Sequence, residues 1–155
     1  MIIDIKRLSV EGDTFRGDEP SAFWELPPDQ NLRADRPVHY ELKAYVVSDE
    51  LVVRGRLETQ VDFRCSRCGE FFTMTVSDPA FACVREILPG MESADLTAEI
   101  RETIILCFPA YPVCRTDCRG LCAQCGASLS EGECHCRPPA DGRWGMLSHL
   151  NVKQS

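Results

Sequence analysis

Ten cysteines stand in this chain of 155 residues, and six of them fall between residues 114 and 136. That stretch is polar and rich in glycine, and no apolar repeat of helix or strand period runs through it, so side-chain burial cannot be what orders it. Cysteines at this density form disulfides, hold an iron–sulfur cluster or bind zinc. The pattern therefore predicts a lobe that is ordered through its sulfur atoms.

Two Cys-x-x-Cys-Gly motifs, called knuckles below, favour zinc. They begin at Cys65 and Cys122. Two cysteines at this spacing can grip one tetrahedral ion, and the glycine admits a positive φ angle where the chain folds back under the metal. A thioredoxin-like dithiol is the alternative for the first knuckle, but it needs a helix where strands are expected here. An iron–sulfur cluster also uses four cysteines, yet the usual ferredoxin spacings do not occur.

Eight cysteines are enough for two zinc ions with four thiolates each. The predicted ligands are Cys65, Cys68, Cys114, Cys118, Cys122, Cys125, Cys134 and Cys136. Loop-closure entropy favours near neighbours, so the last four should close among themselves and the first pair should join the second pair. The rival grouping joins the two knuckles around one ion. Sites with four thiolates are closed to substrate, so both ions are predicted to be structural and no catalytic residue is expected.

The remaining candidates receive structural or supporting roles. Cys83 and Cys107 lie among apolar residues and are expected to behave as small buried hydrophobes. His135 is an alternative ligand in place of a neighbouring thiolate. The arginines nearest the cysteines are expected to donate to sulfur or to contact phosphate, and they are Arg64, Arg67, Arg115 and Arg119.

A β-hairpin must position the first knuckle. Apolar residues alternate with polar ones over residues 37–63 around a turn at residues 48–50, which predicts an antiparallel hairpin with one solvated face. The second strand leads directly into the first knuckle, and residues 71–76 and 81–87 are expected as a third and a fourth strand. The face predicted to be buried consists of Val38, Tyr40, Leu42, Ala44 and Val46, then Leu51, Val53, Gly55, Leu57, Thr59, Val61 and Phe63.

One helix completes the predicted body. Asp95 is its expected N-cap, apolar residues from Leu96 to Cys107 recur at three and four, and Phe108-Pro109 ends it. Residues 1–10 are expected as a strand and residues 12–20 as a polar loop. The apolar cluster that follows this loop is expected to cover the core, and it consists of Phe23, Trp24 and Leu26.

The predicted fold class is therefore α+β, an antiparallel sheet packed by one main helix, with a Cys-rich zinc-binding lobe near the C-terminus. Residues 1–110 form the predicted body. Residues 111–137 form the cysteine lobe, which joins the knuckle at residues 65–68, and residues 138–155 form a tail that is expected to include a short helix.

Composition and charge exclude several classes of protein. The chain is 44% hydrophobic and 26% charged, with no apolar run that could span a bilayer and no signal-peptide pattern at its start. A cytoplasmic location is expected, where a reducing milieu disfavours disulfides. The net charge of −7 argues against a general nucleic-acid coat. Residues 1–62 carry 8 basic and 13 acidic side chains, whereas residues 110–155 carry 5 and 4, so a local RNA contact near the cysteines is compatible with the charge.

Three segments resemble the YceD family of bacteria and plastids, which is named for large ribosomal RNA subunit accumulation. They are the hairpin ELKAYVVSDELVVRGRLETQVDFRCSRC, the helix DLTAEIRETIILCFP and the cysteine run PVCRTDCRGLCAQCGASLSEGECHC. The helix followed by the cysteine run is the specific part of the likeness. The chain departs from the family pattern at Cys107, where alanine or valine is common, and in a shortened C-terminus after Pro139.

The resemblance implies a role in the accumulation or processing of 23S rRNA and in biogenesis of the large ribosomal subunit. The family has no established catalytic residues, and its cysteine-rich tail is optional, which implies a supporting role for the second metal. We therefore expect a non-enzymatic factor without a small-molecule substrate, whose partner is pre-rRNA or an early large-subunit protein. RNA contact is expected near Arg115, Arg119 or Arg143. The alternatives are a zinc-stabilised protein adaptor without RNA contact and a thiol redox switch.

Overall fold

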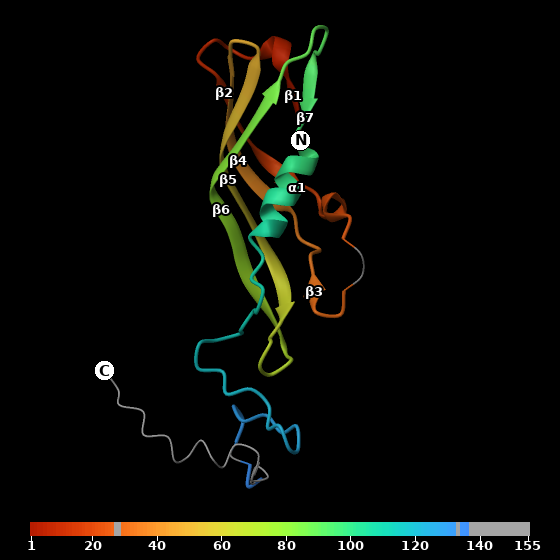
Figure 1. Cartoon of the computed structure of the whole chain (residues 1–155), viewed down its shortest axis with the longest axis vertical. Coiled ribbons are helices and arrows are strands. Elements are labelled where there is room, and N and C mark those ends of the chain that lie inside the picture. The colour runs from red at the N-terminus through yellow and green to blue at the C-terminus, as the bar shows by residue number, and fades with distance from the viewer. Residues whose placement is uncertain (27–28, 133, 137–155) are drawn as a thin grey trace, which may run out of the picture.

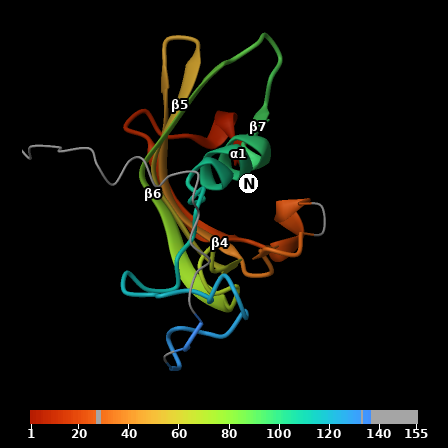
Figure 2. The same cartoon turned by 60° about the horizontal axis from the view of Figure 1, so that its bottom comes forward.

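The computed structural model describes residues 1–26, 29–132 and 134–136. One long antiparallel sheet curves around a single α-helix, and the cysteine lobe lies beyond one end of the sheet (Figures 1 and 2). The fold class is α+β, as predicted. The elements are β1 (Ile2–Asp4), η1 (Ile5–Arg7), β2 (Asp13–Glu19), η2 (Ser21–Trp24), β3 (Leu32–Arg33), β4 (Val38–Val47), β5 (Glu50–Arg64), β6 (Phe71–Glu86), β7 (Ser93–Asp95) and α1 (Thr97–Leu106).

Strand β5 is the centre of the main sheet. It pairs with β4 and then β3 along one edge and with β6 along the other, while β2 extends the sheet beyond β4. Strands β1 and β7 form a separate two-stranded sheet. Every pairing is antiparallel, and the β5–β6 hairpin is the longest feature of the body. Its turn, at the end nearest the lobe, carries the first knuckle (Figure 1).

The predicted β4–β5 hairpin is confirmed, and its predicted inner face is largely buried, except at Val46 near the turn, which is exposed. Residues of β5 alternate between buried and exposed from Leu57 to Arg64. At the pair Leu42–Gly55 the strands approach so closely that a Cβ atom on residue 55 would lie 2.0 Å from the Glu41 carbonyl oxygen. Only glycine fits there, because any side chain would force β4 away from β5.

Helix α1 and η2 cover the concave face of the sheet. Leu96, Ile100 and Ile104 are fully buried against it, as the spacing of three and four predicted. Phe23 and Trp24 from η2 are buried beside them, which agrees with the predicted cover over the core. The ring of Phe108 fills the end of this core, and its centroid lies 5.4 Å from that of Phe63 and 5.9 Å from that of Trp24.

Three strand predictions need correction. Residues 13–19, expected as a loop, form β2, because seven backbone pairs to β4 outweigh their polar composition. Residues 71–76 and 81–87 were expected as two strands, but residues 71–86 form the single strand β6, which ends before Ile87 and absorbs the interruption at Pro79 as a β-bulge. Residues 1–10 form only the short strand β1 before the chain turns into η1.

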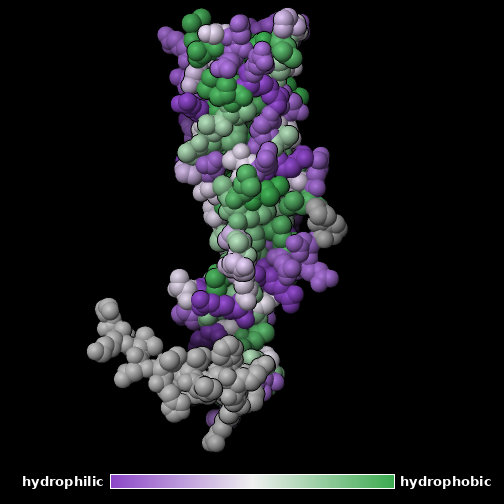
Figure 3. Space-filling model, viewed as in Figure 1, coloured by the Kyte–Doolittle hydropathy of each residue, from purple (hydrophilic) through white to green (hydrophobic). Residues whose placement is uncertain are grey.

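The two ends of α1 also differ from the prediction. The helix begins one residue later than expected, with Leu96 at the N-cap position, while the Asp95 carboxylate accepts the Thr97 amide at 3.0 Å. Cys107, expected in the core, is exposed, because the last turn tightens and brings Phe108 into the core instead. Hydrophobic surface gathers at mid-height in Figure 3, over this end of α1, where Leu106 is 76% exposed.

Among the described residues, α1 has neither the length nor the apolar run that a transmembrane helix requires, and no other segment forms such a helix. The predicted tail at residues 138–155 lies outside the described residues.

Candidate metal centres

The first knuckle is a tight turn between β5 and β6. The amide of Cys65 donates to the Glu70 carbonyl at 2.8 Å, and the amide of Gly69 donates back to the Cys65 carbonyl at 2.9 Å. Gly69 has a φ angle of +77°, which favours glycine. The turn therefore holds Cys65 and Cys68 with both sulfurs on its inner side.

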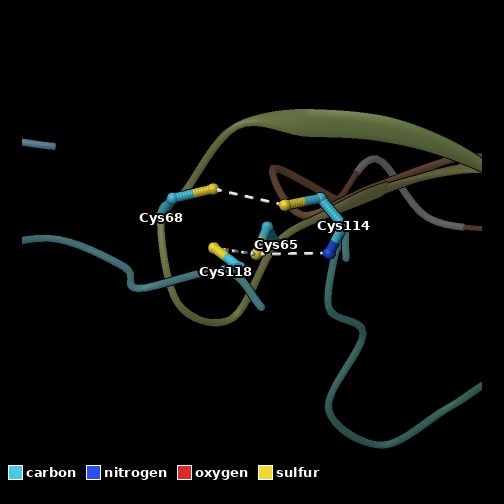
Figure 4. Close-up of side chains that lie close together, drawn as sticks. All are labelled: Cys65, Cys68, Cys114 and Cys118. Carbon is cyan, nitrogen blue, oxygen red and sulfur yellow. Dashed lines mark hydrogen bonds between the residues drawn. The ribbon is translucent and has the colours of Figure 1, made fainter. Parts of the chain in front are cut away.

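Two cysteines from the segment after α1 meet this knuckle. The sulfur of Cys118 lies 3.9 Å from that of Cys65, and the sulfur of Cys114 lies 3.8 Å from that of Cys68. Figure 4 shows the four side chains converging from the two segments. Cys65 and Cys118 are each only 3% exposed, so the group is closed on one side by the protein.

The second knuckle repeats the hydrogen bonds of the first. The amide of Cys122 donates to the Ala127 carbonyl at 2.8 Å, the amide of Gly126 donates to the Cys122 carbonyl at 2.8 Å, and Gly126 has a φ angle of +72°. Cys134 and Cys136 complete this group, which is more exposed than the first. Each knuckle thus provides half of its own group, and the structure brings the sulfurs together in the favoured grouping and not in the rival one.

The sulfur spacing fits a tetrahedral ion. Within each group the four sulfur atoms all lie within 4.8 Å of one another. A tetrahedron with metal–sulfur bonds of about 2.3 Å has sulfur–sulfur edges of about 3.8 Å, which matches the two distances in the first group. A disulfide needs a sulfur–sulfur distance of about 2.05 Å, and all ten cysteines are free thiols. Each group of four could therefore hold one metal ion.

The electrostatics of the first group indicate crowding of thiols around one position. Burial acts to raise the pKa of Cys65, but the amides of Cys114 and Arg67, at N–S distances of 3.4 Å, help to lower that pKa to about 6. Burial, and then hydrogen bonding with the neighbouring thiols, raise the pKa of Cys114 to about 12. Four sulfurs in this space cannot all be thiolates unless a cation lies among them.

The second group shows the same asymmetry. Hydrogen bonds from the amides of Cys125 and Gln124 lower the pKa of Cys122 to about 6. Hydrogen bonding with Cys125, followed by burial, raises the pKa of Cys136 to about 12. The two groups therefore share the same thiol chemistry on knuckles of the same backbone geometry, and a divalent cation would stabilise the thiolates of either.

Arg67 and Gly120 fasten the two groups to each other. The guanidinium of Arg67 donates to the carbonyls of Thr116, at 3.2 Å, and of Cys118, at 2.9 Å. The Arg67 carbonyl accepts the Leu121 amide at 3.3 Å, and a Cβ atom on residue 120 would lie 2.9 Å from that carbonyl oxygen. Arg67 donates to sulfur, as one of its two predicted roles, but through its backbone amide to Cys65, while its guanidinium donates to backbone oxygens. The role of Gly120 was not predicted, although a glycine between two cysteines was a signal for it.

The other candidates lie outside both groups. Cys83 is half-buried against the core, where burial raises its pKa, and His135 is exposed and belongs to neither group of ligand atoms. Arg64 donates to the Gly69 carbonyl at 2.8 Å, so it supports the knuckle through the backbone. Arg115 lies 3.4 Å from Asp117, a carboxylate that neutralises it locally.

Comparison with known proteins gives the family. The family model described as "Large ribosomal RNA subunit accumulation protein YceD" matches residues 77–151, from the middle of β6 through both cysteine runs of the lobe. An uncharacterized protein of Mycobacterium tuberculosis is 43% identical over 97% of this chain and 81% of its own length. An uncharacterized protein of Mycobacterium leprae is 26% identical over 74% of this chain, which spans 59% of that relative.

A plant protein carries the same name as the family model. It is "Large ribosomal RNA subunit accumulation protein YCED homolog 1, chloroplastic" of Arabidopsis thaliana, 32% identical over 63 residues, which are 40% of this chain and 20% of that protein. No solved structure matches the chain. The match to the family model over sheet, helix and cysteines, together with the plant relative named as a YCED homolog, shows that the chain belongs to the YceD family.

Proposed function

We propose that this protein is a non-enzymatic, zinc-binding factor of large-subunit ribosome biogenesis that supports the accumulation of 23S rRNA. The observation that carries the proposal is the match of residues 77–151 to a family named for large ribosomal RNA subunit accumulation. The plant relative of the same name supports it. The partner is pre-rRNA or an early large-subunit protein, met in the cytoplasm.

The geometry of the cysteine groups supports zinc as the metal. Four sulfurs with edges of 3.8 and 3.9 Å leave room for one ion at their centre. An iron–sulfur cluster contains several irons and bridging sulfides and needs a wider cage. Zinc with four thiolates is the common structural site of this size, and the glycine after each Cys-x-x-Cys pair is typical of it.

A structural role for the zinc follows from the ligand count. Four cysteines fill the four positions of a tetrahedral ion, so neither group keeps a position at which water could be activated. The hydrophobic core contains no residue beyond Phe108 among the described residues. Metal binding therefore orders the lobe, whereas the hydrophobic core orders the body.

Gene deletion tests the proposed function. The expected result is a fall in the ratio of 23S to 16S rRNA, restored by the wild-type gene and not by the variant Cys65→Ser with Cys68→Ser. The variant Cys83→Ser is the matched control, since Cys83 lies outside both groups. An unchanged rRNA ratio in the deletion strain would contradict the proposal.

A protein-interaction adaptor that does not contact RNA is the second candidate, and the net charge of −7 favours it. The dependence of rRNA affinity on salt concentration distinguishes the two candidate functions. Binding through phosphates weakens steeply as salt rises because counterions are released. An adaptor would bind a ribosomal protein and show no salt-dependent affinity for rRNA.

A further inference from the structure

Four cations lie together on the outer face of the main sheet, the face opposite α1. The strand register places Arg16, Glu41 and Arg56 in one row across β2, β4 and β5, and Lys43 opposite Arg54 in the next row. The four cationic side chains are exposed. We call these five residues the cation patch. Its net charge of +3 stands out in a chain of net charge −7.

The first row of the patch is partly neutralised within the protein. Arg16 donates to Glu41 at 2.8 Å, and Arg56 lies 2.9 Å from the other oxygen of the same carboxylate. These two arginines, Arg16 most strongly, hold the pKa of Glu41 below its usual range. Glu41 is therefore an anion with both of its oxygens in use, and it cannot neutralise the second row as well.

The second row is electrostatically unfavourable for the fold. Lys43 and Arg54 are direct cross-strand neighbours, and like charges at such positions destabilise a sheet. In the described part of the chain, no carboxylate forms an ion pair with either side chain. The burial of apolar residues on the other face does not require cations here. A like-charge pair that costs stability and has no anionic partner in the protein is expected where a ligand supplies the anion.

The shape of the surface around this row suits an extended ligand. A shallow groove of about 340 Å³ runs beside this row. Its charged lining residues are Lys43, Arg54, Arg56 and Glu41, and its lining also includes Thr14 and Pro79. Pro79 belongs to the bulge in β6, and bulges recur beside functional sites. On the side toward the β4–β5 turn, the next row of the same face is apolar and contains Tyr45, Val52 and Val84.

We infer that the cation patch binds the phosphodiester backbone of ribosomal RNA. The inference rests on the proposed function and adds the surface through which it acts. Lys43 and Arg54 meet phosphates directly, and the apolar row with Tyr45 meets ribose or an unpaired base, as in other sheets that bind RNA. The predicted site at the cysteine lobe is weaker, because Asp117 and Glu131 balance Arg115 and Arg119 in the hollow there, whereas cations outnumber the one carboxylate in the groove at the patch.

The test compares two double variants of equal charge. One is Lys43→Gln with Arg54→Gln, and the control is Lys6→Gln with Arg7→Gln in η1, outside the patch. The probes are labelled transcripts that tile 23S rRNA, titrated at several KCl concentrations. The patch variant should bind about tenfold more weakly at physiological salt, and its slope of log affinity against log salt should fall by about 1.4, because two phosphate contacts are lost.

Thermal melting checks that the patch variant is folded, and its melting temperature should equal or exceed that of the wild type because a like-charge pair has been removed. Equal affinities of the patch variant and the wild type would overturn the inference and leave the proposed function in place. Equal losses in the patch variant and the control would overturn it as well, since net charge alone would then explain binding. A wild type that binds no transcript would refute RNA contact, while the proposed function would still be judged by the 23S to 16S ratio.

Discussion

Gly120→Ala should loosen the cysteine lobe, although it alters no cysteine. Gly120 has a φ angle of +74°, and an added Cβ atom would lie 2.9 Å from the Arg67 carbonyl oxygen. The left-handed conformation costs an alanine about 1–2 kcal/mol. Displacing the Arg67 carbonyl weakens its hydrogen bond with the Leu121 amide, which adds about 1 kcal/mol. The sum is about 2–3 kcal/mol, or a fall in zinc affinity of about 30- to 150-fold.

Substitutions at two further glycines separate the cost of the positive φ angle from the cost of displacing the Arg67 carbonyl. Gly126 has a φ angle of +72°, and no atom of the described residues lies within 4 Å of an added Cβ atom, so Gly126→Ala should cost only the conformational part, about 1–2 kcal/mol. Gly132 has no positive φ angle, and an added Cβ atom there would meet no described atom within 4 Å, so Gly132→Ala should leave the zinc affinity unchanged. Zinc affinity is measured by competition with a chromogenic chelator. If Gly120→Ala retained zinc as tightly as Gly132→Ala, the assigned fastening of the lobe to Arg67 would be wrong.

Three other predictions concern the body. Asp95→Ala should lower the free energy of unfolding by about 1 kcal/mol at pH 7, because the hydrogen bonds from Thr97 to this carboxylate are lost. The Thr97 hydroxyl and amide lower the pKa of Asp95. The stabilisation is therefore present above the ordinary pKa of about 4 and is lost as the pH falls through the lowered pKa, and urea unfolding at several pH values would show this. Phe108→Ala should cost about 3 kcal/mol in the same assay, without loss of zinc, because its ring packs on Phe63 and Trp24. Cys107→Ser should change the free energy of unfolding by less than about 0.5 kcal/mol and leave the zinc content unchanged, because Cys107 is exposed and outside both groups. A large loss of stability or of zinc would contradict the assignment of Cys107 as an exposed residue that binds no metal.

Local pattern was sufficient for much of the fold. The period-2 alternation of residues 37–63 and the spacing of Leu96, Ile100 and Ile104 are properties of single segments, and both elements formed as predicted. Strand β2 was missed because its stability comes from pairing with β4, about 25 residues away, and not from its own composition. Phe108 and not Cys107 packs in the core because the last turn of α1 is tight. Apolar spacing alone does not reveal that tight turn.

The cysteine groups were predictable for a physical reason that the cation patch lacks. The four thiols of the second group close short loops, so sequence distance indicates that they meet. The first group, whose two pairs are far apart in the sequence, follows because its four thiols are the ones that remain. The patch depends on the register of three strands, which sets Lys43 opposite Arg54 across the turn. A shift of one residue would turn each of these side chains to the opposite face of the sheet. The signal therefore appears only once the pairing is known.

Hydrogen exchange measured with and without a zinc chelator tests the central claim, that metal bound by sulfur orders the cysteine lobe. The amides of Cys122, Gly126 and Leu129 are hydrogen-bonded within the lobe. In reduced, zinc-loaded protein these amides should be protected, and the chelator should abolish their protection while β5 and α1 keep theirs. Lobe amides that remained protected after the metal had been removed would contradict the account.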